Sequence, residues 1–230
     1  MKISIIIPVL NEENSISKIL DYLLEIQNPE FTKEIIIVDG GSNDKTLEIL
    51  ENFSTIKIIH SKKGRAIQMN IGAKNASSEI LYFLHCDTFP PKNFDTEIVN
   101  QVKKNKLSGC FKMKFDNNHI VLKISQWFTK FNHKSCRGGD QSLFIERNLF
   151  EKLNGFDEKL TIYEDNEFIH RLYENSKFVV IQKSVITSDR KYIKNGVWKL
   201  QFHFMMIHFK YWLGSSQEKL VEYYQENIKS

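Results

Sequence analysis

The chain has 230 residues, 41% of them hydrophobic and 26% charged, with a formal net charge of +4. These values predict one globular domain, and lysines scattered along the chain argue against nucleic-acid binding. The three cysteines lie far apart and outside any CxxC pattern, which argues against a disulfide framework or a structural zinc site and favours a reducing compartment. The N-terminal apolar run is too short for a secretion signal, and no stretch reaches the length of a membrane span. We therefore expect a cytoplasmic protein and leave open a peripheral position at the inner face of the membrane.

The first 90 residues alternate short apolar runs with segments of helical spacing. The apolar runs at residues 3–8, 34–38, 56–60 and 80–85 are predicted to be strands buried on both faces. Residues 15–27, 45–53 and 65–75 are predicted to be helices, the second with Asp44 as its N-cap, because apolar residues recur there every three or four positions. This alternation is typical of a doubly wound, Rossmann-like α/β sheet.

The second half of the chain is less regular. Helices are predicted at residues 94–104, 120–131, 147–154 and 163–175, and strands at 108–115, 142–145, 178–181 and 185–187. Gly155 is expected to end the third of these helices in a left-handed conformation. No linker divides the chain. We expect a single domain over residues 1–230, with a nucleotide-binding half (1–90), a second half (91–195) and C-terminal helices (196–230).

An imidazole and a carboxylate follow the apolar run 80–85. His85 and Asp87 are two residues apart, so they should point to the same side of the strand end, where open parallel sheets bind ligands. Such a pair can hold a divalent cation, which a diphosphate leaving group needs for charge neutralisation. The alternative is a buried, hydrogen-bonded His85 beside an Asp87 that only begins a turn.

Two further loops carry ligand-binding chemistry. Asp39 ends the second predicted strand and can accept a hydrogen bond from a base N–H or a ribose hydroxyl. Lys63, Gly64 and Arg65 place two cations and a flexible backbone at the start of a helix, where backbone N–H groups favour an anion. The alternatives are an aspartate that only begins a glycine turn and a solvated charge pair.

Five motifs occur in the order and spacing of family 2 glycosyltransferases with a GT-A fold, which the chain resembles over nearly its whole length. They are residues 5–12 (IIIPVLNE), 37–44 (IVDGGSND), 63–65 (KGR), 85–87 (HCD) and 164–165 (ED). Residues 64–70, 83–88 and 139–141 resemble the subgroup found beside radical-SAM and selenium-related domains. The resemblance implies a GT-A architecture: a Rossmann-like nucleotide-binding half with a central, mostly parallel sheet, and a less regular acceptor half.

The resemblance also implies roles for single residues. Asp165 would be the base that deprotonates the acceptor hydroxyl with inversion of the anomer, although acids in a helix's first turn also complement its dipole. Asp87 would bind Mg²⁺ or Mn²⁺ together with diphosphate oxygens and water. The family's metal motif has two flanking acids, and His85 replaces the first, so it is expected to touch ribose, bind metal or only pack. Nucleotide-sugar contacts are expected from Pro8, Val9, Leu10, Glu12, Asp39, Lys63, Gly64, Arg65, Gln68, His85, Asp87 and Arg190, and sugar or acceptor contacts from Asp140, Gln141 and Glu164.

The C-terminal stretch from Val197 to Leu213 is rich in aromatic residues. As a helix it would carry an apolar stripe of Trp198, Phe202, Met205, Phe209 and Trp212, and a polar one of Lys199, His203 and Lys210. A stripe of this kind is most often core, here sealing the site against the sheet. The alternative is a helix lying in the bilayer interface, which would suit a lipid-linked acceptor.

Together these features predict a metal-dependent, inverting glycosyltransferase that moves a hexose from a UDP- or GDP-sugar to a hydroxyl acceptor. A sugar nucleotidyltransferase also uses a strand-end acid and a metal. However, residues 9–13 (VLNEE) stand where such enzymes have a glycine-rich, arginine-containing loop. The second alternative is a non-catalytic nucleotide-sugar-binding protein, encouraged by the histidine at position 85.

Overall fold

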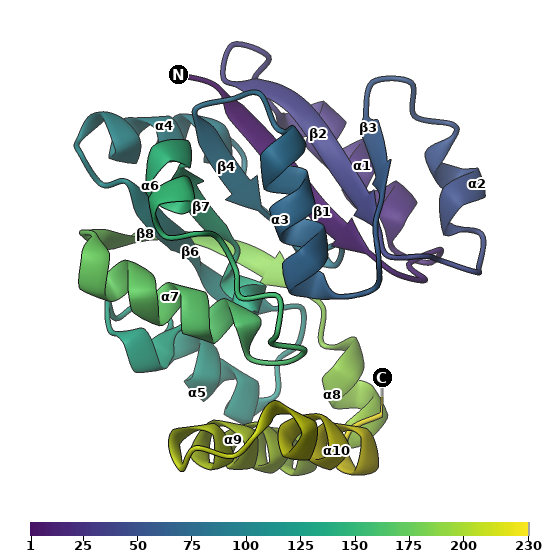
Figure 1. The fold of residues 1–230 in the computed structure, drawn as a ribbon, viewed down its shortest axis with the longest axis vertical. Helices are drawn as coiled ribbons and strands as arrows, with labels where there is room; N and C mark the ends of the chain where they lie inside the picture. Colours follow the sequence, from purple (N-terminus) through teal and green to yellow (C-terminus); the bar gives the residue numbers. More distant parts are fainter. Residues whose placement is uncertain (230) are drawn as a thin grey trace.

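The computed structural model describes residues 1–229, which form one mixed eight-stranded sheet with helices on both faces (Figure 1). The strand order is β3-β2-β1-β4-β7-β6-β8-β5. The four parallel strands are β1 (Ile3–Val9), β2 (Thr32–Asp39), β3 (Lys57–His60) and β4 (Ile80–Phe83). This confirms the Rossmann-like half. The chain order reverses between β1 and β4, and in open sheets that reversal is where ligands bind.

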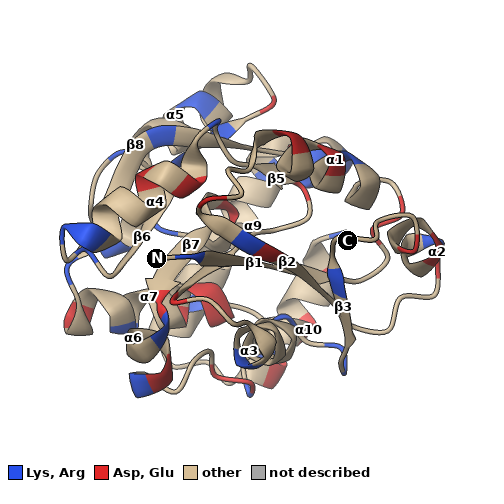
Figure 2. Cartoon of the chain, turned by 90° about the horizontal axis from the view of Figure 1, so that it is seen from above, with Lys and Arg blue, Asp and Glu red and all other residues tan. Residues whose placement is uncertain are grey.

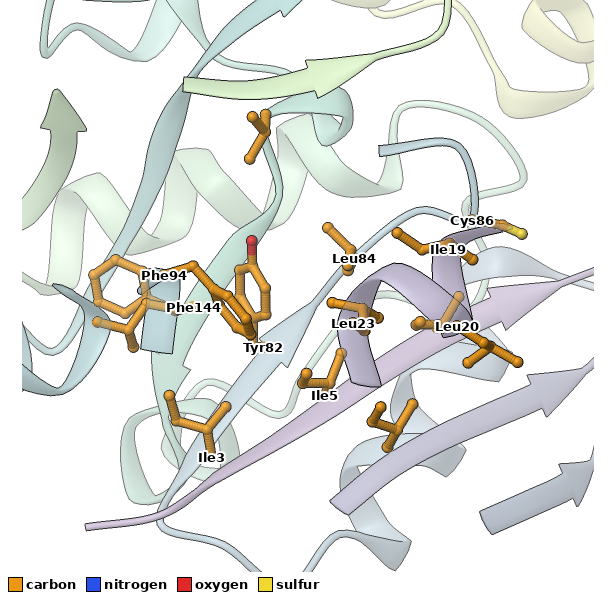
Figure 3. Close-up of a cluster of buried hydrophobic side chains, with 14 of the residues drawn as sticks. Ile3, Ile5, Ile19, Leu20, Leu23, Tyr82, Leu84, Cys86, Phe94 and Phe144 are labelled. Carbon is orange, nitrogen blue, oxygen red and sulfur yellow. The ribbon is translucent and has the colours of Figure 1, made fainter. Parts of the chain in front are cut away.

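Two apolar cores cover the two faces of this sheet. Along β1, Ile5 and Ile7 belong to one core and Ile6 to the other, as the two-residue period of a strand requires. Both acidic and basic residues occur on helices around the sheet (Figure 2). The first core takes its helical side chains from α1 (Ile16–Ile26) and α4 (Phe94–Lys103), with Leu50 from α2 (Thr46–Leu50) (Figure 3). The second takes them from α3 (Arg65–Asn75), α6 (Arg147–Lys152) and α7 (Glu164–Asn175).

The second half of the chain adds four strands to the same sheet. They are β5 (Thr88–Phe89), β6 (Ser108–Phe115), β7 (Leu143–Glu146) and β8 (Phe178–Thr187); β6 and β8 pair in parallel, while β7 is antiparallel to both β4 and β6. The sequence predicts two strands where β8 is continuous. Phe111 of β6 pairs with Ile181, and Lys112 pairs with Ser184. The register shift between them leaves Gln182 and Lys183 unpaired with β6 but does not end β8. The prediction has no counterpart of β5, which is only two residues long.

The connections of this half are short. Helix α5 spans Ile120–Phe128 and ends three residues before the predicted boundary, followed by two 3₁₀ turns at Lys134–Cys136 and Gly139–Gln141. Gly155 has φ +62°, which confirms the left-handed helix end. The prediction of Asp44 as the N-cap is wrong, because α2 begins one residue later than expected, with Lys45 as its N-cap; Asp44 Oδ1 instead accepts a hydrogen bond from Thr46 N at 2.9 Å from the position before the cap.

Three C-terminal helices form a layer beyond the sheet (Figure 1): α8 (Arg190–Asn195), α9 (Val197–Trp212) and α10 (Gln217–Asn227). The prediction that the aromatic stripe of α9 is core is wrong, because Trp198 is 71% and Trp212 78% exposed. The helix packs through a narrow face of Leu200, His203 and Ile207, and the broader aromatic face points outward. Within residues 1–229, no helix is both long and apolar enough to cross a bilayer.

Replacing Gly72 by alanine is expected to destabilise the fold by about 1–3 kcal/mol. This glycine lies in α3 where the helix approaches β1, and an added Cβ would lie 2.4 Å from Ile6 Cγ2 and 3.1 Å from Val38 Cγ2. The higher helix propensity of alanine offsets only about 1 kcal/mol, so the clash decides. Chemical denaturation measures the change, with Lys74→Ala on the exposed side of α3 as the control. An unchanged free energy of unfolding for Gly72→Ala would contradict this packing.

Candidate active site

A pocket of about 520 Å³ lies beside the carboxyl ends of β1 and β4. Segments far apart in the sequence line it: the loop after β4, the first residue of α3, residues 138–140, the start of α7, the loop after β8, and side chains of α9 and α10. The predicted site residues that line it are Pro8, Glu12, Arg65, His85, Asp87, Asp140, Glu164, Asp165 and Arg190. The fold therefore brings most of the charged residues of the prediction to one cavity.

Asp165 lies in the first turn of α7 and faces two basic groups. Its Oδ2 is 3.6 Å from Arg65 Nη1 and 3.7 Å from His85 Nε2. The carboxylate is largely buried, yet it lines the pocket. The start of α3, the end of β4 and the start of α7 thus converge on one acid, which can take a proton from a group bound in the pocket.

His85 is held between two carboxylates. Its Nδ1 is 3.4 Å from Asp140 Oδ1, while Nε2 faces Asp165. Burial by itself lowers the pKa of His85, but the contact with Asp140 and the negative charges of Asp165 and Asp140 outweigh it and raise the pKa above its ordinary value. Because both ring nitrogens face acids, the geometry favours a positioning role for this histidine over metal ligation.

Glu164, next to Asp165, is turned toward Arg65 and almost fully buried. Its Oε1 accepts a hydrogen bond from Arg65 Nη1 at 3.1 Å. Burial and then the neighbouring charge of Asp165 raise the pKa of Glu164, while Arg65 opposes this shift. The side chain fixes the guanidinium that also faces Asp165.

A second charged cluster joins the loop after β8 to the ends of β1 and β4. Arg190 donates two hydrogen bonds to the carboxylate of Glu12, at 2.8 and 2.7 Å, and its Nε lies 3.2 Å from Asp87 Oδ2. Two carboxylates and one half-exposed guanidinium therefore share this part of the pocket. The fork geometry of arginine suits both carboxylates and phosphates.

The residues around Asp87 fit a metal ion only if other groups complete its ligand set. Residues 1–229 contain no group of three or more His, Cys, Asp or Glu side chains placed to hold a metal. Asp87 would supply one carboxylate oxygen, and a hard cation takes the remaining oxygens from diphosphate and water. The site thus fits Mg²⁺ or Mn²⁺ arriving with a diphosphate and does not fit a structural metal.

Asp39 and Gln68 lie beside the pocket rather than on its wall. Asp39 is buried at the end of β2, and its carboxylate accepts hydrogen bonds from the N–H groups of Gly41 and Ser42 at 3.0 and 3.1 Å. Gln68 Nε2 donates to the carbonyls of Val9 and Val38 at 2.8 and 2.7 Å. The amide of Gln68 therefore ties α3 to β1 and β2, a framework role in place of the predicted ligand contact.

Gln141 likewise lies beneath the glycine loop. Its Nε2 donates to the carbonyl of Cys136 at 2.8 Å, and its Oε1 accepts from the buried guanidinium of Arg137. This pairing shapes the loop that carries Gly139, where an added Cβ would lie 2.0 Å from Asp165 Oδ2. The other predicted residues outside the pocket lining are Val9, Leu10, Lys63 and Gly64.

The aromatic part of the pocket is not predicted from the sequence. Tyr163 precedes the two acids of α7 with φ +73°, an uncommon value for a side chain of this size. Its ring stacks on Tyr211 at 4.1 Å, and its hydroxyl lies 3.0 Å from His208 Nδ1. In the sequence, only its position next to the Glu164–Asp165 motif indicates that Tyr163 belongs to the site. No sequence feature indicates the other lining residues that were not predicted, among them Phe204, Ile207, His208, Val221 and Tyr224.

These features define the class of protein. A parallel Rossmann-like half continued by antiparallel strands, with acids from a strand end and a helix start in one pocket, is the GT-A fold of glycosyltransferases. Residues 4–154, more than half of the chain, match the profile of Glycosyl transferase family 2. The chain belongs to this family.

Two relatives illustrate how far the likeness extends. A dolichyl N-acetyl-α-D-glucosaminyl phosphate 3-β-D-2,3-diacetamido-2,3-dideoxy-β-D-glucuronosyltransferase from Methanococcus voltae is 27% identical over 220 residues, which are 90% of this chain and 63% of the relative. Glycosyltransferase AglE from Haloferax volcanii is 37% identical over 172 residues, 69% of this chain and 57% of AglE. The chain therefore spans less than two thirds of either relative.

Solved structures support the fold. TarS 1–349 from S. aureus in complex with UDP superposes with a TM-score of 0.69 at 23% identity, covering 82% of this chain and 60% of TarS. The complex of the same protein with UDP-GlcNAc gives a TM-score of 0.65 at 22% identity, with 82% and 58% covered. These relatives give no support to the narrower resemblance to the radical-SAM and selenium-related subgroup.

Proposed function

We propose that this chain is a metal-dependent, inverting glycosyltransferase that moves a hexose from a UDP- or GDP-sugar to a hydroxyl acceptor. One observation carries the proposal: a single pocket is lined both by the buried acid Asp165 and by the Asp87–Arg190 pair from the sheet edge. Transfer from a nucleotide sugar needs a base for the acceptor and a positive charge for the leaving diphosphate. The UDP and UDP-GlcNAc complexes of TarS support a UDP-sugar as the donor.

Asp165 is the proposed base. In an inverting displacement the acceptor oxygen attacks the anomeric carbon opposite the leaving group, and its proton passes to a carboxylate on the acceptor side. Arg65 and His85 hold Asp165 Oδ2 in place through contacts of 3.6 and 3.7 Å.

Asp87 and Arg190 are proposed to act on the leaving group. A divalent cation bound with the donor supplies charge neutralisation at the diphosphate. Asp87 would hold this ion, and Arg190 would turn its guanidinium from Glu12 and Asp87 toward the phosphate oxygens. Asp87 lies on the loop after β4 and Arg190 is the first residue of α8, so both side chains can be repositioned without moving the sheet.

We place the acceptor against the C-terminal helices. The C-terminal helices supply an apolar part of the pocket lining, with Phe204 and Ile207 from α9 and Tyr224 from α10. Aromatic and aliphatic side chains of this kind suit a sugar face or an acyl group better than a phosphate.

Cys86, Cys110 and Cys136 are free thiols, which supports the proposed cytoplasmic location.

The proposal is tested by offering the protein UDP- and GDP-sugars with and without Mn²⁺. Thermal shift should identify a stabilising nucleoside diphosphate, and the matching sugar nucleotide should be hydrolysed slowly when no acceptor is added. Pyrophosphate release from a nucleoside triphosphate and sugar phosphate would instead indicate a nucleotidyltransferase. Tight donor binding without any hydrolysis would indicate a nucleotide-sugar sensor.

Asp87→Ala is expected to remove the tightening of nucleoside diphosphate binding by Mn²⁺, an effect of roughly tenfold or more. The physical reason is the loss of the carboxylate that is proposed to hold the ion near the diphosphate. Isothermal titration with and without Mn²⁺ measures it, with Asp116→Ala, an exposed acid outside the pocket, as the control. An unchanged response to Mn²⁺ in Asp87→Ala would count against the ligand role.

A further inference from the structure

Helix α9 presents a row of large apolar side chains away from the protein. Trp198, Phe202, Met205, Phe209 and Trp212 follow one another at intervals of three or four residues and are 50–78% exposed. Leu200, His203 and Ile207 form the opposite, buried face. Rows of this size on a folded protein usually mark a surface that contacts something else.

The row continues onto helix α5. Ile120, Ile124, Trp127, Phe128 and Phe131, on or just after α5, are 42–63% exposed. The two helices are in contact, and the ring of His119 lies 6.4 Å from that of Trp198, so the apolar rows meet at the start of both helices. The α5–α9 face is defined here by Ile120, Ile124, Trp127, Phe128, Phe131, Trp198, Phe202, Met205, Phe209, Trp212 and Leu213.

The charged residues of the two helices that carry this face have one sign. Residues 117–139 and 190–216 contain none of the chain's 28 acids, whereas they contain nine lysines and arginines, of which Arg137 is buried and Arg190 binds Glu12 and Asp87 in the pocket. Lys123 on α5 and Lys199 on α9 are exposed, and Lys130 Nζ lies 3.9 Å from the centre of the Trp127 ring. Acids reappear in α10, with Glu218, Glu222 and Glu226, so the acid-free surface belongs to α5 and α9.

We propose that the α5–α9 face docks the protein on an anionic lipid bilayer. Tryptophan and phenylalanine side chains enter the headgroup region, and lysines among them are attracted by anionic lipids. A second copy of the chain fits less well, because a two-fold contact through this face would place its lysines against one another.

Docking would also bring an acceptor to the pocket, an inference that rests on the proposed function. Phe204, Ile207 and His208 of α9 line the pocket, while Phe202, Met205 and Phe209 of the same helix face outward. One helix therefore separates the catalytic pocket from the proposed lipid surface. An acceptor hydroxyl carried on a lipid headgroup would meet the site from the edge of α9.

The test is flotation of the full chain with vesicles of phosphatidylglycerol and phosphatidylcholine, compared with phosphatidylcholine alone. The protein should float with the anionic vesicles, and added NaCl should weaken this binding. The exposed pair Trp198→Ser/Trp212→Ser should weaken it roughly tenfold or more, since two aromatic anchors leave the interface. Intrinsic fluorescence should shift to the blue on binding in the wild-type protein.

A charge-matched pair of variants isolates the electrostatic part. Lys123→Gln/Lys199→Gln should weaken binding to anionic vesicles roughly tenfold, whereas Lys18→Gln/Lys103→Gln, with the same net charge but exposed lysines elsewhere, should have a much smaller effect. Equal effects of the two pairs would overturn the proposed face. So would flotation of the tryptophan variant at the wild-type level, or a dimer that this variant dissociates while vesicles bind neither protein.

Docking and catalysis can fail separately. The tryptophan variant should hydrolyse the donor in solution at the wild-type rate, since neither tryptophan lines the pocket. Vesicle binding without any donor hydrolysis would leave the docking face standing and refute the proposed transferase. Hydrolysis without vesicle binding would refute the docking face alone.

Discussion

Asp165→Asn is expected to lower the rate of sugar transfer by about 10²- to 10⁴-fold, the usual contribution of a positioned general base. Asparagine keeps the size of the side chain but accepts no proton at neutral pH. Asp165 contacts Arg65 and His85, whereas the proposed diphosphate contacts, Asp87 and Arg190, pair with each other elsewhere in the pocket. Affinity for the nucleoside diphosphate should therefore stay near the wild-type value, as measured by calorimetry beside the transfer assay.

Glu164→Gln is the matched comparison for this variant. It makes the same chemical change one residue earlier, at a carboxyl group that is buried against Arg65 and whose pKa burial already raises. The amide oxygen of glutamine can still accept the hydrogen bond from Arg65, so transfer should fall far less than in Asp165→Asn. If the two variants lose transfer equally, or if Asp165→Asn turns over like the wild-type protein, the base has been assigned to the wrong residue.

Gly139→Ala is expected to reduce transfer by about 10²-fold while the fold stays nearly as stable as the wild type. The new Cβ would lie 2.0 Å from Asp165 Oδ2 and 3.0 Å from His85 Cε1. Both atoms are ends of side chains that can move, so the clash is relieved by displacing the proposed base rather than by unfolding. A displacement of about 1 Å is enough to lose the alignment needed for proton transfer.

Gly138→Ala provides the control for this prediction. A Cβ at position 138 would meet nothing within 4 Å, and its backbone is extended, with φ −166°, which any residue adopts. This variant adds its methyl group to the same loop without meeting Asp165, so it should keep far more transfer than Gly139→Ala, and both variants should unfold at similar denaturant concentrations. Wild-type transfer by Gly139→Ala would mean that Asp165 does not need the position seen in this structure.

The nucleotide-binding half follows closely from the sequence. Its strands are continuous apolar runs because both of their faces are buried, and its helices show regular spacing because one face packs on the sheet. The C-terminal layer follows less well. Helix α9 has more apolar residues than its packing uses, and no periodicity can tell which apolar stripe a tertiary contact will cover.

The site was predictable where residues stand at the ends of regular elements. His85 and Asp87 follow β4 and Asp165 begins α7, so placing the elements also places these side chains. Gln68 and Gln141 fall within the same motifs but bond to main-chain carbonyls of neighbouring segments, Val9 and Cys136 among them. Those partners depend on the packing of distant segments, which a local pattern does not encode.

The contacts of Arg190 with Glu12 and Asp87 bear on how a donor would enter the pocket. The guanidinium serves as a tethered counter-ion that offsets one of the two negative charges before any ligand arrives. Under the proposed function, a nucleotide sugar arriving with a divalent cation would exchange one positive partner of Asp87 for another and would release Arg190 to the phosphates. Entry would then replace one counter-ion by another around two fixed carboxylates, Glu12 and Asp87.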